Sequence, residues 1–237
     1  MPFYYNYKVH HTSSPTAIIG GGKKISPGEI TLASNGILLL DELAEFPRSV
    51  LESLRQPLED GKISITRAHY KVNFPSKFLL VGTSNPCPCG FYFEGDKCNC
   101  SQHEVTKYMK KLSGPIMDRI DIHIEMRRLS EDELMNSSVA ESSEEIRKRV
   151  IKVREIQRER FGNDETLNSN MSSSDIKKYC KILPEDREYF KSAIQMLGIS
   201  ARGYDKILKT ARTIADLDDS IEIKRFHLME ALSFRRK

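Results

Sequence analysis

Runs of consecutive aliphatic residues in the first half of the chain predict the strands of a parallel sheet. One run covers 37–40, between a glycine and two acidic residues, and a second covers 78–83. Uninterrupted apolar runs of this length are typical of strands buried on both faces, as in parallel sheets covered by helices. A further apolar segment at 120–124 predicts a third strand.

The residues between these runs have the periods of a hairpin and of helices. Residues 63–74 alternate between apolar and polar on both sides of a basic tip, Arg67-Ala68-His69, which predicts a β-hairpin. Apolar residues at helical spacing predict helices over 47–60 and 104–112. Pro57 is awkward inside the first of these helices and is expected to kink or shorten it.

Beyond about residue 127 the apolar runs end and helical periodicity takes over. A long charged helix is predicted at 144–161, with the apolar stripe Ile146, Val150, Val153 and Ile156. Further helices are predicted at 174–180, 184–197, 201–217 and 224–234. The fold class is therefore α/β followed by all-α: a core with a parallel sheet and flanking helices over 1–127, then a helical domain over 128–237.

Composition narrows the class of protein only in part. The chain has 237 residues, 39 % of them hydrophobic, and a formal net charge of +4. No run of about 18 apolar residues occurs, which argues against a membrane span, and the first residues lack the pattern of a signal peptide. The mild positive charge permits nucleic-acid binding without arguing for it.

The acidic pair at the end of the first apolar run is the strongest chemical signal. Asp41 and Glu42 follow the predicted strand directly, at the edge where open parallel sheets bind ligands. There an Asp can hold the water shell of Mg²⁺ and a Glu can polarise an attacking water. Asn85, at the end of the next strand, could reach the same water. The simpler alternatives are that the acids open a loop and that Asn85 is a turn residue.

Two arginines are candidates for contact with phosphate. Arg119 precedes the predicted third strand, and in oligomeric ATPases such an arginine can act on the γ-phosphate bound by a neighbouring subunit. Arg202 lies at the start of a predicted helix, which is a suitable place for a phosphate contact. A salt bridge for Arg119 and a solvated side chain for Arg202 are the alternatives.

A phosphate-binding loop is missing from these 237 residues. Its pattern is G-x-x-x-x-G-K-[ST]. The glycine run at 20–22 does not fit, because Ala17 lies five residues before Gly22 and Lys23 is followed by Lys24. No other segment of the sequence matches the pattern.

Four of the five cysteines form two C-x-C pairs within fourteen residues and make a candidate zinc site. They are Cys87, Cys89, Cys98 and Cys100. Four thiolates can surround a tetrahedral Zn²⁺, although this spacing is tighter than the usual C-x₂-C. Reduced, unligated thiols and disulfides are the alternatives, and a reducing compartment disfavours disulfides. Cys180 is expected to be a core thiol. The pair His10-His11 cannot converge on a metal without other ligands.

Several motifs occur in a fixed order over about 10–235. They are SPGEITLASNGILLLDELAEF, LRQPLEDG, ITRA, FLLVGTSNPCPCG, LSGPIMDRIDIH and SARGYDKILKTAR. Together they resemble the magnesium-chelatase-like AAA+ ATPases of the ComM/YifB family. The resemblance implies a bacterial, cytoplasmic protein that forms ATP-driven hexameric rings of like subunits. It also implies DNA as a partner, in branch migration during natural transformation.

The resemblance also implies a role for each candidate residue. Asp41 and Glu42 resemble the Walker B pair, with Asp41 on Mg²⁺ and Glu42 as catalytic base. Asn85 resembles sensor 1, Arg119 the arginine finger, and Arg202 the sensor 2 arginine of the helical lid. The Walker A loop and the N-terminal domain of the family are missing here. We therefore expect the chain to be the C-terminal part of such a protein, and to be a very poor ATPase alone.

Two other functions stay open at this point. One is a magnesium-chelatase motor for metal insertion into a tetrapyrrole, although chelatase motors lack the Cys-Pro-Cys-Gly element at 87–90. The other is a non-catalytic, zinc-stabilised module that binds DNA. In a ring motor the hairpin tip with Arg67, His69 and Lys71 could contact DNA phosphates, and a solvated turn is the alternative.

Overall fold

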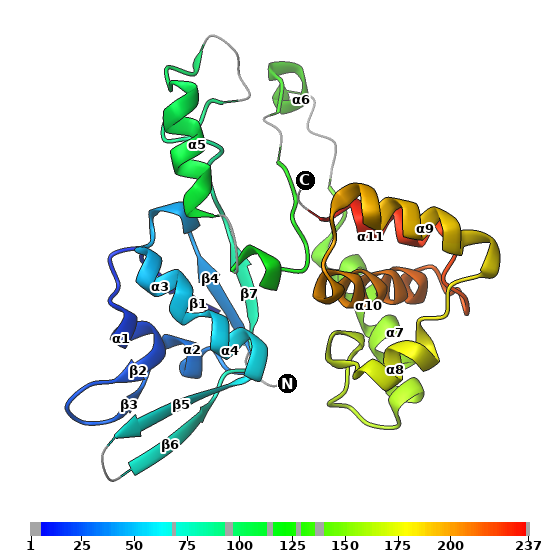
Figure 1. The fold of residues 1–237 in the computed structure, drawn as a ribbon, viewed down its shortest axis with the longest axis horizontal. Helices are drawn as coiled ribbons and strands as arrows, with labels where there is room; N and C mark the ends of the chain where they lie inside the picture. The colour runs from blue at the N-terminus through cyan, green and yellow to red at the C-terminus, as the bar shows by residue number, and fades with distance from the viewer. Residues whose placement is uncertain are drawn as a thin grey trace. The chain divides into compact units, whose positions relative to one another are not determined.

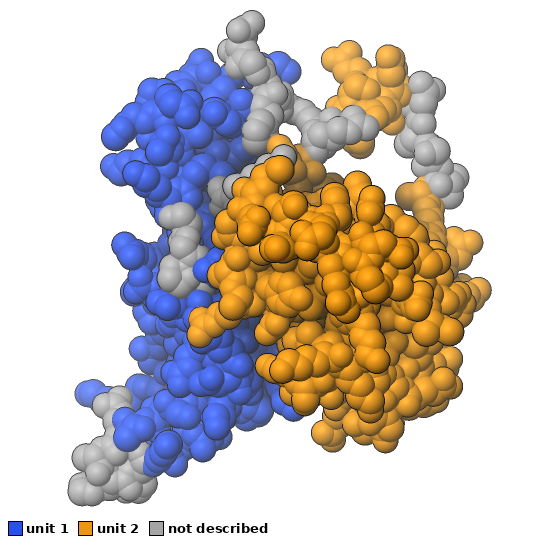
Figure 2. Space-filling model, turned by 45° about the vertical axis from the view of Figure 1, so that its right-hand side comes forward, with its two compact units in different colours: residues 1–120 blue, residues 121–237 orange. Residues whose placement is uncertain are grey.

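A computed structural model describes residues 6–67, 70–92, 97–112, 116–126, 129–135 and 140–235. By their internal contacts they divide into two units, residues 1–120 and 121–237 (Figures 1 and 2). Each unit has a buried apolar core of its own. The predicted domain boundary at 127–128 stays a prediction, because these two residues lie outside the described ranges.

A parallel three-stranded sheet forms the centre of the first unit. Its strands, in the order β1-β4-β7, are β1 (Asn6–Val9), β4 (Ile37–Leu40) and β7 (Leu79–Gly82). Leu40 pairs with Val9 on one side and with Gly82 on the other. Leu38 and Leu40 are fully buried, which confirms the predicted central strand. β1 was not predicted from the sequence.

The two other predicted strands need correction. The run at 78–83 does form β7, but Leu79 and Val81 are 61 % and 39 % exposed, so this edge strand is not buried on both faces. The third strand predicted at 120–124 does not form, and residues 120–126 have no strand pairing in the structure. An apolar run is not sufficient for a strand, because its backbone groups also need a partner strand.

Short helices accompany the sheet. They are α1 (Pro15–Ile19), α2 (Glu29–Leu32), α3 (Arg48–Ser53), α4 (Arg55–Asp60) and α5 (Gln102–Lys111), with 3₁₀ turns at Leu43–Glu45 and Met117–Arg119. The single helix predicted over 47–60 is two helices that meet at Leu54. Pro57 explains the break, because it has no N–H to donate to the carbonyl of Ser53. α5 confirms the helix predicted at 104–112.

Two antiparallel hairpins belong to the first unit. β5 (Lys62–Arg67) and β6 (Tyr70–Pro75) form the predicted hairpin, although tip residues 68–69 and the side chain of Arg67 lie outside what the structure describes. β2 (Gly20–Gly21) pairs with β3 (Ser26–Pro27) in the other. Residues 20–22 have φ between +94° and +110°, so the glycine run serves a turn that other residues rarely adopt.

Helices make up the second unit. They are α6 (Glu131–Met135), α7 (Ser143–Phe161), α8 (Ser173–Tyr179), α9 (Pro184–Leu197), α10 (Ala201–Leu217) and α11 (Arg225–Ser233), with a 3₁₀ turn at Asn168–Asn170. The predicted helices beyond residue 143 all form, and α6 was not predicted. α10 supplies much of the core through Ile207, Leu208 and Ala211. Cys180 lies in this core as predicted, and burial raises the pKa of its thiol to about 11.

α7 buries only the second half of the predicted stripe, where Val153 is buried and Ile156 is half-buried. Ile146 and Val150 are 43 % and 51 % exposed, whereas Val153 and Gln157 are buried. The helix is therefore anchored through its second half. Among the described residues, no helix combines the length and the apolar character needed to cross a bilayer.

A buried charge cluster joins α7 to α10. The Asp216 carboxylate is 1 % exposed and accepts hydrogen bonds from Arg160, from Arg212 and, at 2.7 Å, from the amide of Asn168. Arg212 is itself 3 % exposed and also donates to the carbonyl of Ile221 at 2.7 Å. Each buried charge thus has an ionic or carbonyl partner, as burial requires.

We expect Asp216→Asn to lower the free energy of unfolding by about 3–5 kcal/mol, because it removes the carboxylate that pairs with the buried Arg212 and the largely buried Arg160. Denaturant titration followed by circular dichroism measures the change. The matched control is Asp219→Asn, whose ion pair with Lys152 is 55 % and 60 % exposed and should contribute less than about 1 kcal/mol. Equal losses in the two variants would contradict this assignment.

Candidate functional site

Acidic and hydroxyl side chains meet at the carboxyl edge of the parallel sheet. Asp41 and Glu42 directly follow β4, and Thr83 directly follows β7. Lys8 comes from β1, one residue before the position paired with Leu40. Because the three strands are parallel and in register, residues that are far apart in the sequence lie together at this edge.

Thr83 connects the two strand ends. Its hydroxyl donates to Asp41 Oδ1 at 2.5 Å and accepts from the Glu42 amide at 3.2 Å. Its carbonyl accepts from the Leu43 amide at 2.7 Å, and its amide donates to the Leu40 carbonyl at 3.1 Å. The turn after β4 is therefore held against the end of β7 by both the side chain and the backbone of one residue.

Lys8 keeps the Asp41 carboxylate ionised. Its ammonium lies 2.8 Å from Asp41 Oδ2. The hydrogen bond from Lys8, followed by that from Thr83, lowers the pKa of Asp41 below its usual value. The same contact raises the pKa of Lys8. The edge thus presents a charged carboxylate that already accommodates one positive charge.

Glu42 has an unusual backbone and a histidine beside it. Its φ and ψ are 56° and 52°, in the left-handed region that glutamate seldom adopts. His11 Nδ1 lies 3.6 Å from Glu42 Oε2, and the His11 ring packs edge-on against Phe46 with centroids 6.4 Å apart. An outlier of this kind, held by the surrounding bonds, is typical of functional sites.

The site thus contains two residues that sequence reasoning did not place there, Lys8 and His11. Both reach the acids through β1, which pairs with β4 but has no clear apolar pattern. The pair His10-His11 was considered only as a metal site. No signal in the sequence alone would have placed its second member next to Glu42.

Asn85 lies further along the same loop and is exposed. A Cβ added at Gly90 would lie 3.9 Å from Asn85 Cγ, an ordinary van der Waals distance. No hydrogen bond joins Asn85 to Asp41 or Glu42 among the residues that the structure describes. Asn85 therefore follows the strand next to that of the acids and forms no hydrogen bond with them among the described residues.

The two predicted phosphate-binding arginines belong to other elements than the acids. Arg119 ends the 3₁₀ turn Met117–Arg119, its side chain is only 9 % exposed, and it donates to Glu59 Oε1 on α4 at 2.6 Å. Arg202 is exposed in the first turn of α10, in the second unit.

The four clustered cysteines converge after β7. Their sulfur atoms all lie within 4.8 Å of one another, and the measured separations are 3.3 Å for Cys87–Cys89, 3.6 Å for Cys89–Cys98 and 3.9 Å for Cys87–Cys98. All four are free thiols, and Cys87 is fully buried. The amide of Phe91 is the main cause that lowers the pKa of the Cys89 thiol, to about 6.

These sulfur positions fit a tetrahedral metal. Four ligands at the usual Zn–S distance of about 2.3 Å stand about 3.8 Å apart, which is close to the measured separations. The oxygen groups of Asp41, Glu42 and Thr83 instead suit a hard cation such as Mg²⁺, which takes oxygen ligands and keeps several waters. The chain thus offers two different donor sets, one of thiols and one of oxygens.

Comparison with known proteins shows what the chain is similar to. Residues 2–134 match the family profile "Magnesium chelatase, subunit ChlI", and residues 140–235 match "Magnesium chelatase, subunit ChlI C-terminal". The chain is 45 % identical over 227 residues to the competence protein ComM of Haemophilus influenzae. It is 41 % identical over 228 residues to the uncharacterized protein YifB of Escherichia coli.

Both alignments cover 95 % of this chain but only 44 % of the relative, so the chain spans less than half the length of these proteins. The magnesium-chelatase subunit ChlI homolog of Methanocaldococcus jannaschii is 24 % identical over 233 residues, or 92 % of this chain and 56 % of that protein. The resemblance seen in the motifs is confirmed.

We expect Lys8→Met to raise the pKa of Asp41 towards its ordinary value of 3.8, because the variant removes the main group that favours the carboxylate. Carboxyl ¹³C NMR titration measures the shift, and Lys23→Met is the control. Since the folded pKa is depressed, the stabilising contact is present above the ordinary pKa and is lost as pH falls through the folded pKa. An unchanged Asp41 titration in Lys8→Met would refute this account.

Proposed function

The chain belongs to the magnesium chelatase ChlI family, and from this membership we propose that it forms part of the ATP-hydrolysing site of a ring-shaped AAA+ motor. The observation that supports the proposal most directly is the Asp41–Thr83 contact at the carboxyl edge of the sheet. It places an ionised carboxylate where open parallel sheets bind their ligands.

In this proposal the two acids have different roles, one in binding Mg²⁺ and the other in proton transfer. Asp41 holds the water shell of Mg²⁺, and Glu42 takes a proton from the attacking water, with His11 close enough to orient its carboxylate. ATP would supply the phosphoryl group, and Mg²⁺ would neutralise the negative charge of the phosphate oxygens. Lys8 must then share the Asp41 carboxylate or release it, because the ammonium already lies 2.8 Å away.

The remaining candidates act around the phosphate. Asn85 is proposed to reach the same water as sensor 1, and Arg202 to contact the nucleotide as sensor 2. Arg119 is proposed as the arginine finger for a neighbouring subunit in a hexamer. It can do so only by exchanging Glu59 for phosphate oxygens, and guanidinium groups pair well with both.

The phosphate loop is proposed to come from residues outside this chain. The 237 residues contain no G-x-x-x-x-G-K-[ST] segment, and the chain corresponds to 44 % of its curated relatives. Without that loop the backbone cradle and the lysine that hold the β- and γ-phosphates are missing.

DNA is the proposed polymer on which the motor acts, in recombination or natural transformation. The support is the 45 % identity to a protein named as a competence protein, together with the exposed Lys71 near the hairpin tip. The alternative substrate, a tetrapyrrole, is suggested by the family name. The Cys-Pro-Cys-Gly element at 87–90, which chelatase motors are expected to lack, argues against it.

We expect the isolated chain to hydrolyse ATP at the background rate. In a protein that joins this chain to a phosphate loop, Glu42→Gln should lower turnover by about 10²–10⁴-fold and leave nucleotide affinity unchanged, since it removes only the base. A coupled phosphate-release assay measures turnover. Glu45→Gln, which changes a neighbouring acid, serves as control. Hydrolysis by the isolated chain that Glu42→Gln abolishes would overturn the need for a loop from elsewhere.

We also propose that the four clustered cysteines bind one structural Zn²⁺. We expect about one equivalent of zinc in the purified chain by elemental analysis, and loss of that zinc in Cys98→Ser with a lower melting temperature. Cys180→Ser is the control, because this thiol lies in the core of the second unit and should leave the zinc content unchanged. Zinc well below one equivalent in chain purified without chelator would rule out the site.

A further inference from the structure

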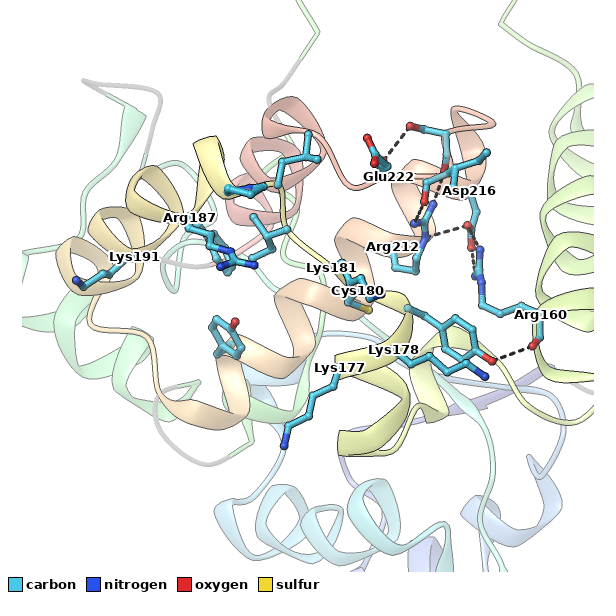
Figure 3. Close-up of a pocket in the computed structure, with 18 of the residues that line it drawn as sticks. Arg160, Lys177, Lys178, Cys180, Lys181, Arg187, Lys191, Arg212, Asp216 and Glu222 are labelled. Atoms are coloured by element: carbon cyan, nitrogen blue, oxygen red, sulfur yellow. Dashed lines mark hydrogen bonds and ion pairs between the residues drawn. The ribbon is translucent and has the colours of Figure 1, made fainter.

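A large groove opens in the helical unit between α8, α9 and α10. Its volume is about 1420 Å³ (Figure 3). Its apolar walls include Ile182, Leu183 and Ile194, and its floor includes Phe190 and Tyr204, whose ring centroids lie 5.5 Å apart. Phe190 is the one α9 side chain in the buried apolar core of this unit. Ala193 and Ile194 of α9 also pack against this core, and the buried Asp186 of α9 pairs with Arg225 of α11 at 2.7 Å. The apolar channel lies beside α9.

The mouth of the groove is basic. Lys177 and Lys181 come from α8 and the residues just after it, and Arg187 and Lys191 come from α9 (Figure 3). All four side chains are exposed. Within the described ranges, Lys177, Lys181 and Arg187 form no ion pair. The deeper Arg212, by contrast, is neutralised by Asp216.

The size of the groove favours a polypeptide over a small molecule. Small-molecule sites usually measure about 300–1,000 Å³. A helical segment of seven residues, taken as a cylinder about 10 Å wide and 10.5 Å long, occupies about 820 Å³, which the groove can hold with room to spare. An apolar bed with a basic rim therefore matches a short amphipathic segment that carries acidic side chains.

The same unit displays a segment with this complementary character. In residues 129–135, which include α6, Glu131 and Asp132 are exposed, and neither has an ion pair among the residues described. Leu129 and Met135 are 53 % and 86 % exposed. Lys191 pairs with Glu188 at 3.9 Å, and Glu222 also lines the groove. One unit thus carries a groove with three basic side chains that form no ion pair among the described residues, and an acidic segment with exposed apolar side chains, and each could cover the other.

We propose that the groove binds the 129–135 segment of a second copy of this chain. The contact joins two different surfaces, so it is head-to-tail, and such contacts repeat around a ring. The inference rests on the ring assembly in the proposed function, but it needs neither nucleotide nor zinc. Leu129 and Met135 would enter the apolar channel, and Glu131 and Asp132 would meet Lys177 and Arg187 at its mouth.

Charge reversal in pairs tests the contact. Sedimentation velocity over a concentration series should show self-association of the wild-type chain. Lys177→Glu with Arg187→Glu should raise the dissociation constant at least tenfold, and so should Glu131→Lys with Asp132→Lys. The control, Lys148→Glu with Arg158→Glu, makes the same change in net charge at exposed positions of α7 outside the groove and should have no such effect.

Mixing the two reversed variants provides the decisive measurement. Each retains one native surface, so an equimolar mixture should regain association if the contact is between copies. If the segment docked on its own chain, or if the reversals only unfolded the unit, mixing would restore nothing and the proposal would be wrong.

Self-association that no reversal changes would overturn this contact and leave ring assembly intact. A wild-type monomer at all concentrations would overturn this contact, and ring assembly would then have to be tested in a protein that also contains the phosphate loop. Groove-dependent binding of a single-stranded oligonucleotide without self-association would assign the groove to nucleic acid instead.

Discussion

The parallel pairing of β4 with β7 is the constraint on which the candidate site depends. It brings Thr83 to Asp41 across a separation of 42 residues, and Thr83 then uses its hydroxyl, amide and carbonyl to fix the turn after β4. A slip of one residue would move every side chain of the strand to the opposite face. The buried Leu38 and Leu40 prevent this slip, because it would carry both out of the core. The apolar residues therefore position the acids without contacting any ligand.

Sequence patterns predicted the elements whose signals are local. The central strand, the hairpin and the later helices follow from apolar runs and from periods of two and 3.6 residues, which the chain carries within each segment. β1 could not be predicted, because its four residues gain their order from pairing with β4. The prediction at 120–124 failed for the converse reason, since the apolar run there has no partner strand. The acids were found as single residues, while Lys8 and His11 needed the β1–β4 register.

The helical unit separates its charges by depth. Asp216 forms ion pairs with two arginines in the interior, where an unpaired charge would lower the free energy of unfolding by several kcal/mol. The lysines and the arginine at the mouth of the groove need no such partner, because water solvates them. Their positive charge is thus available to an acidic surface. The same reasoning applies to Arg119, whose burial against Glu59 means that any phosphate must offer the guanidinium a comparable partner.

The position of the cysteine cluster gives a physical reason for a metal there. The loop that leaves β7 carries Asn85 and then Cys87 only two residues later. Phe91 and Tyr92 are 37 % and 38 % exposed, so apolar burial holds this loop only weakly. Gly90, the residue after Cys89, lies beside Asn85, because a Cβ added there would be in van der Waals contact with the Asn85 side chain. A metal bound by the four thiols would replace the missing core, and it would hold Asn85 at a fixed distance from the acids across the sheet edge.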